Sequence, residues 1–151
     1  MYSLKALFVQ ILAIGLLFGC SGNTTDSTTA EESEDSLIGT WELAYYMTME
    51  AGKIESPNDG KPVYWDLKAD GTYEGQAGNN SILGNHRIEN GKMIFTYLTT
   101  EVARTEWETL FVESLKLNYQ DSVYVLPIVQ INNELIFNYQ NDDTMHFIRR
   151  P

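Results

Sequence analysis

Apolar and polar residues alternate in short runs between turn signals over residues 37–151. Asn-Gly and Asp-Gly pairs between such runs favour two-residue hairpin turns, whose central residues need positive φ angles. The turn signals are Asn58-Asp59-Gly60, Asp70-Gly71, Asn90-Gly91, Asn132-Asn133 and Asn141-Asp142-Asp143. They predict antiparallel strands over residues 41–48, 63–68, 72–76, 86–89, 92–97, 124–131, 134–139 and 144–149. Because Pro127 lacks a backbone N–H, we expect an edge or a bulge at that point.

One stretch departs from this alternation and predicts a helix. Thr105 and Glu108 have the spacing of a capping box, with a hydroxyl at the N-cap and a carboxylate three residues later. Apolar side chains then recur at helical spacing, at Trp107, Leu110, Phe111 and Leu115. The sequence therefore predicts a helix from Glu106 to about Leu117 that packs on the sheet. Its acidic residues, Glu106, Glu108 and Glu113, are expected to face solvent.

Strands, one helix and further strands predict an α+β fold that is mostly β. We expect an antiparallel, barrel-like sheet of about seven or eight strands, with one packed helix at about residues 105–117; closure removes exposed edges. In the adjacent aromatic pairs Tyr45/Tyr46 and Tyr64/Trp65, one member should face outward. The many Thr, Asn, Gln and Glu residues on the strands favour a filled core over a ligand cavity.

The N-terminus has the pattern of an export signal. Lys5 precedes an apolar run, residues 6–18, whose helical length of roughly 20 Å is too short for a membrane span. Leu17-Phe18-Gly19-Cys20 resembles the lipobox of bacterial lipoproteins. The resemblance implies a signal peptide over residues 1–19, cleavage before Cys20, lipid on its thiol and attachment to a membrane. Ser21 follows Cys20 where an Asp would retain enterobacterial lipoproteins, which favours the outer membrane of a bacterial cell envelope.

Residues 20–36 lack aromatic and large apolar side chains and carry five acids, so they predict a disordered tether. The domain, residues 37–151, has nine basic and sixteen acidic residues, a formal charge of −7. This charge argues against nucleic acid or anionic lipid as a partner.

No catalytic or metal-binding pattern stands out. Cys20 is the only cysteine, and its acylation would leave no thiol for a disulfide, a nucleophile or a metal. His86 and His146 are the only histidines and belong to no ligand motif. The glycines at 75, 78 and 84 lack the strand–glycine–helix order of a phosphate loop, so they favour bulges and tight turns. We expect no catalytic residue, no cofactor and no metal.

The glycine stretch and the segments after it resemble the META domain (HslJ-like) family, over roughly residues 39–149. The matching motif positions are Gly75, Gly78, Asn80, Gly84, Thr99 and Thr100, followed by the helix and a final hairpin. The family pattern has cysteines where this chain has Asn79 and Arg104. Their joint absence implies an intact fold without any bridge between these positions.

A second resemblance is to the lipocalins. Gly39-Thr40-Trp41 is a G-x-W element near the start of the domain, and Arg149 and Arg150 lie near its end. In lipocalins such a Trp and a late Arg pack together at the closed end of the barrel.

These resemblances imply different functions. The META-like reading implies a non-enzymatic, monomeric envelope lipoprotein with a structural or stress-related role through contacts with an envelope protein. The lipocalin-like alternative is a binder of a small apolar ligand, which requires a continuous internal cavity. A third hypothesis is an inhibitor of a secreted enzyme, with residues 98–104 as the exposed loop.

Overall fold

The computed structural model describes residues 34–57 and 59–151. Its elements are α1 (Glu34–Leu37), β1 (Gly39–Thr48), β2 (Gly52–Glu55), β3 (Val63–Leu67), β4 (Thr72–Ala77), β5 (Asn80–Glu89), β6 (Lys92–Phe95), β7 (Leu98–Thr99), α2 (Glu106–Lys116), β8 (Tyr119–Gln120), β9 (Val123–Ile131), β10 (Glu134–Gln140) and β11 (Asp143–Arg149). The predicted signal peptide, Cys20 and most of the predicted tether lie outside the described residues.

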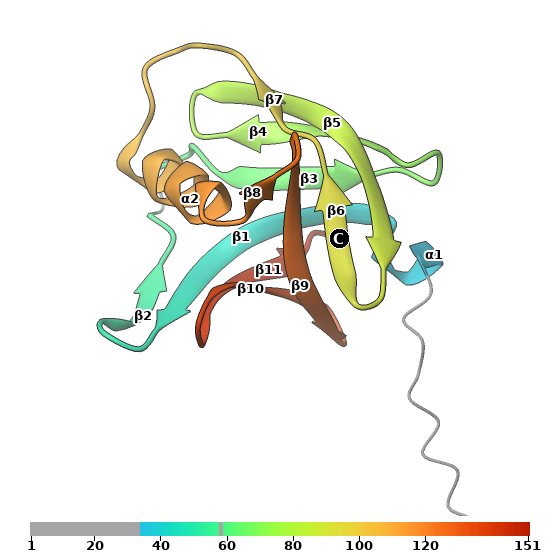
Figure 1. The fold of residues 1–151 in the computed structure, drawn as a ribbon. Coiled ribbons are helices and arrows are strands. Elements are labelled where there is room, and N and C mark those ends of the chain that lie inside the picture. The colour runs from blue at the N-terminus through green and yellow to red at the C-terminus, as the bar shows by residue number, and fades with distance from the viewer. Residues whose placement is uncertain (1–33, 58) are drawn as a thin grey trace, which may run out of the picture. The chain divides into compact units, whose positions relative to one another are not determined.

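Eight strands of the described residues close into an antiparallel barrel (Figure 1). Neighbours follow the order β10-β11-β1-β3-β4-β5-β6-β9, and pairing of β9 with β10 completes the circle. The short strands β2, β7 and β8 extend β1, β5 and β9 at the margins. The fold is thus the expected mostly β barrel with one packed helix.

The predicted hairpins are present. Asn90 and Gly91 have φ angles of 52° and 69°, as a type I′ turn requires, and they join β5 to β6. β5 begins six residues earlier than predicted, because its first half lies in the polar, glycine-containing stretch. Gly84 marks the change of neighbour within β5, which pairs with β7 through Leu83 and with β6 from His86 onward. A Cβ at Gly84 would lie 2.2 Å from the Thr96 carbonyl oxygen, so only glycine fits this corner.

Pro127 does not end its strand, and it lies where one side of β9 has no partner strand, which agrees with the predicted edge. It lies within β9, opposite Lys92 of β6, just before β9 begins to pair with β10 at Ile128. The Ile128 N–H bonds Gly91 on the β6 side, and the Val125 N–H bonds Asn118 on the other side. The backbone nitrogen of Pro127 points to the same side of β9 as the Val125 N–H. At Pro127, β8 has already ended on that side and pairing with β10 has not begun. A missing N–H therefore breaks no ladder hydrogen bond.

Aromatic rings fill the middle of the barrel around Trp65. Trp65 is 0% exposed, and its ring centroid lies 5.0–5.8 Å from those of five other aromatic rings. These rings belong to Tyr73, Phe95, Phe111, Phe137 and Phe147. Tyr46 is also buried, whereas Tyr45 and Tyr64 face outward, as the adjacent aromatic pairs predicted. The filled core expected from the strand composition is confirmed.

Helix α2 covers one end of this core. Thr105 is its N-cap and accepts a hydrogen bond from the Glu108 N–H, as the capping box predicted. Trp107, Phe111 and Leu115 are buried against the barrel. The apolar face of the predicted helix therefore packs as expected, and α2 lies at the opposite side of the sheet from α1 in Figure 1.

The other end is closed by α1 and Arg149. Nη2 of Arg149 donates to the carbonyls of Ser36, at 2.9 Å, and Ile38, and its guanidinium lies 4.9 Å from the Trp41 ring centroid. Trp41 Nε1 donates to the Leu37 carbonyl at 2.8 Å. Residues 34–36 were predicted to belong to the disordered tether, but they are helical because these contacts hold them. The Trp–Arg pairing is the one that the lipocalin resemblance implied.

Candidate functional site

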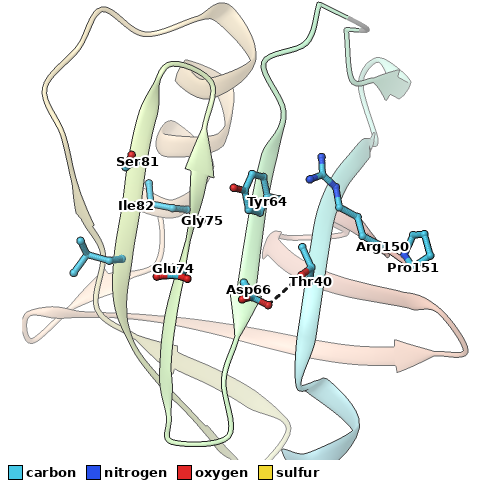
Figure 2. Close-up of a pocket in the computed structure, with 10 residues that line it drawn as sticks. Thr40, Tyr64, Asp66, Glu74, Gly75, Ser81, Ile82, Arg150 and Pro151 are labelled. Carbon is cyan, nitrogen blue, oxygen red and sulfur yellow. Dashed lines mark hydrogen bonds between the residues drawn. The ribbon is translucent and has the colours of Figure 1, made fainter.

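A polar groove of about 550 Å³ lies on the outer face of β1, β3, β4 and β5 (Figure 2). Its position follows from the alternation of the strands, because the inward neighbours of its lining residues, such as Trp41 and Trp65, form the core. The lining consists of Thr40, Tyr64, Asp66, Glu74, Gly75, Ser81, Ile82, Leu83, Arg150 and Pro151.

The groove carries groups of both charges around one aromatic ring. Thr40 Oγ1 donates to Asp66 Oδ1 at 3.0 Å, the bond drawn as a dashed line in Figure 2. The Arg150 guanidinium lies 4.7 Å from the Tyr64 ring centroid and is paired through Nε with Glu42. Glu74 pairs with Lys68 at 3.0 Å at the edge of the groove. This arrangement can hydrogen-bond a polar ligand or a partner's side chains, and Leu83 adds an exposed apolar contact.

A second cluster of titratable groups lies on the outer face of β1, β10 and β11. Glu134 Oε1 accepts a hydrogen bond from Tyr45 Oη at 2.6 Å and lies 2.8 Å from His146 Nδ1. The hydrogen bond to Glu134 raises the pKa of Tyr45 to about 12, and the same bond lowers the pKa of the Glu134 carboxyl. Tyr45 stacks on the imidazole at 4.3 Å, and Thr144 Oγ1 lies 2.8 Å from His146 Nε2.

The hydroxyl of Thr144, the imidazole of His146 and the carboxylate of Glu134 follow one another in the order of a nucleophile, its base and the group that orients the base. Here the imidazole side chain is only 13% exposed beneath Tyr45, and Glu134 is shared between two donors. None of these four residues lines the groove in Figure 2. The cluster therefore closes on itself and acts as a cross-strand brace between β1, β10 and β11.

A buried polar latch holds the loop between β7 and α2, and we name it by its residues Asn80, Thr100, Val102 and Glu108. Asn80 Nδ2 donates to Glu108 Oε1 at 2.7 Å and to the Val102 carbonyl at 3.0 Å. Asn80 Oδ1 accepts from the Val102 N–H at 2.7 Å and from Thr100 Oγ1 at 2.9 Å. One side chain thus fixes both backbone groups of Val102, the middle of the loop that was the predicted inhibitory segment.

The latch corrects the prediction for Glu108. Its side chain was expected to face solvent, but it is 0% exposed and lies under the loop, with Arg104 Nε at 3.8 Å from Oε1. Helical spacing places Glu108 between the apolar and polar faces of α2, so its side chain turns inward only if it finds a buried partner. That partner, Asn80, comes from β5, which is distant in the sequence. Burial raises the pKa of nearby Tyr97 to about 12, and the negative charge of Glu108 adds to this shift.

We expect Asn80→Ala to lower the free energy of unfolding by about 2–3 kcal/mol, because it leaves a buried carboxylate without its donor. The freed loop should also make Arg104 more accessible to trypsin. Urea denaturation and limited trypsin digestion measure the two effects.

The matched control is Asn79→Ala. Asn79 Nδ2 makes one exposed hydrogen bond, to the Ala103 carbonyl at 2.7 Å, so its loss should cost less than about 1 kcal/mol. Equal losses for the two variants would contradict the role of the latch.

The structure distributes the predicted motif residues over several places. Asn80 and Thr100 belong to the latch, and Gly78 lies against it, since a Cβ there would come within 2.9 Å of Glu108 Oε2. Gly75 lines the groove, Gly84 forms the corner of β5, and Thr99 pairs with Ile82. Cys20 lies outside the described residues. Sequence reasoning missed the groove, because its lining comes from β1, β3, β4, β5 and the C-terminus, and only the register brings them together.

Within residues 34–57 and 59–151, no group of three or more His, Cys, Asp or Glu side chains is placed to hold a metal. The same residues contain no helix long and apolar enough to cross a membrane.

Comparison with known proteins gives a likeness in structure. No protein-family model matches the sequence, and no curated protein matches it. A protein from Burkholderia xenovorans solved by NMR is 20% identical over 76% of this chain and 85% of that chain, with a TM-score of 0.57. A lipocalin-like protein from Bacteroides uniformis is 14% identical over 76% of this chain and 98% of that chain, with a TM-score of 0.54.

At these identities the likeness concerns the fold alone. It supports the second resemblance drawn from the sequence and lends nothing specific to the META domain. The chain folds as a lipocalin-like antiparallel barrel with one packed helix.

Proposed function

We propose that the chain is a lipid-anchored, non-enzymatic protein of the bacterial cell envelope, whose barrel acts through contacts on its exterior. The lipobox-like segment ending at Cys20 supports the anchor. The observation that carries the exterior role is the packing of five aromatic rings around Trp65, in the space where a carrier would hold its ligand.

The second candidate is a carrier of a small apolar ligand, which the lipocalin-like fold favours. A drug-sized ligand needs a cavity of about 300 Å³ or more. If α2 left the barrel end to make that space, Trp107, Phe111 and Leu115 would be exposed and the Asn80–Glu108 hydrogen bond would break. The groove on the outer face offers about 550 Å³ without any such change. Its mixture of carboxylates, a guanidinium and hydroxyls suits a polar partner.

Uptake of a fluorescent fatty acid separates the two candidates. Residues 21–151, which omit the apolar N-terminal run, should show no saturable binding at concentrations up to about 10 μM. A lipocalin with an open cavity serves as the positive control, and the urea-unfolded chain controls for non-specific adsorption. Saturable uptake of one ligand per chain, with quenching of tryptophan fluorescence, would favour the carrier and contradict the proposal.

A further inference from the structure

An exposed aliphatic strip crosses the outer face of β9, β10 and β11, and we define it as Val129, Ile131, Ile136 and Ile148. Val129 is 53% exposed, Ile131 52% and Ile148 39%. Val129 pairs with Ile136 in the strand register, and Ile131 and Ile148 flank Glu134 from the strands on either side of it. Aliphatic side chains gathered on one face are typical of an interaction surface.

The strip lies at the end of the barrel where the chain enters the domain. Ser36 Oγ donates to Gln130 Oε1 at 2.9 Å, which places α1 beside the end of β9. Thirteen residues separate Cys20 from Glu34. Even fully extended they span about 50 Å, so a lipid at Cys20 keeps this domain within that distance of a membrane. Tethering at this range raises the local concentration of lipid around the strip.

The charges around the strip fit a neutral surface, although the domain is acidic. Both carboxylates beside Ile148 are already paired, Glu134 with Tyr45 and His146, and Glu42 with Arg150. The β9–β10 turn at this end is formed by two neutral asparagines, Asn132 and Asn133. The β10–β11 turn, at the other end of β10, carries Asp142, and Asp143 begins β11. Of these two turns, only the β9–β10 turn carries no carboxylate at its tip. Glu34 and Asp35 belong to α1, which lies beside the same end of β9.

We infer that the strip of Val129, Ile131, Ile136 and Ile148 docks on the neutral headgroup region of the membrane that holds the anchor. The inference rests on the proposed anchoring at Cys20. Docking orients the barrel with the β9–β10 turn toward the lipid and the Asp142 turn away from it. The aliphatic side chains enter the boundary between headgroups and acyl chains, as apolar faces of monotopic proteins do.

Quenching of a tryptophan reporter by brominated phosphatidylcholine tests this orientation. The full chain is expressed in a bacterium and reconstituted into vesicles, with the reporter placed by Asn133→Trp or, as the matched control, by Asp142→Trp. The native Trp41, Trp65 and Trp107 are buried and contribute a common background. Emission of Asn133→Trp should be quenched about threefold more strongly than that of Asp142→Trp. Val129→Ser with Ile131→Ser, added to the Asn133→Trp chain, should abolish the difference while the circular dichroism spectrum is retained.

Three outcomes overturn the inference. Equal quenching at the two sites would exclude the orientation, and quenching unchanged by the two serines would exclude the strip. Blue-shifted emission of Asn133→Trp without vesicles would mean that a second copy or the apolar residues 6–18 cover the strip instead. Intact mass tests the anchor separately. If the chain carries no acyl group, the proposed anchoring fails, and the processed chain is then coupled to maleimide lipid through Cys20 so that docking is still measured.

Discussion

Trp65→Ala should lower the free energy of unfolding by about 3–5 kcal/mol, the usual cost of replacing a fully buried large aromatic side chain by alanine. Trp65 contacts rings from four strands and from α2, so the deletion opens a cavity that no single element can fill. Urea denaturation followed by far-UV circular dichroism measures the change. A loss of this size approaches the whole stability of many small domains.

Trp65→Phe is the comparison that isolates the cavity. It keeps an aromatic ring among Phe95, Phe137 and Phe147 and should cost clearly less than the alanine variant. Trp65 Nε1 has no hydrogen-bond partner among the described residues, so its replacement by Phe loses no buried hydrogen bond. A loss below about 1 kcal/mol for Trp65→Ala would show that the barrel interior is looser than the ring contacts indicate.

Gly75→Ala should destabilise the barrel by about 3 kcal/mol or more, because the new methyl group collides with fixed backbone. A Cβ at Gly75 would lie 2.0 Å from the Tyr64 carbonyl oxygen and 3.2 Å from Trp65 Cα. Gly75 is the register partner of Trp65, so relief of the clash requires separation of β3 from β4. Thermal unfolding and urea denaturation should both shift, and the groove should lose its shape.

Gly52→Ala separates this collision from the general cost of replacing glycine. A Cβ at Gly52 meets nothing within 4 Å, although φ is +69°, so we expect a loss of about 1 kcal/mol. If the two variants lose the same stability, close approach of β3 and β4 is not what requires glycine at position 75.

The sequence predicted those parts of the fold that depend on local signals. The Asn90-Gly91 turn and the Thr105 cap are short-range devices, so the hairpin and the helix that they define appear as expected. Alternation correctly predicted that only one of Tyr64 and Trp65 faces outward, because side chains alternate between the two faces of any strand. The short strand β2 was missed, since its Gly-Lys-Ile-Glu sequence has little apolar character and only β1 supports it.

Features that depend on distant partners could not be predicted in the same way. The burial of Glu108 depends on Asn80, and the tether boundary depends on Arg149 reaching the Ser36 carbonyl. The groove depends on the register of four strands and on the position of the C-terminus. A polar pair such as Asn79-Asn80 within a glycine-containing stretch gives no indication that its second member is buried with four hydrogen bonds.

The pairing of β1 with β11 sets the earliest moment at which the barrel can close. One edge of β1 has no partner strand until β11 has been synthesised, about a hundred residues later. Such long-range closure slows folding relative to proteins built from local contacts. The barrel can therefore close only after the last strand has left the ribosome.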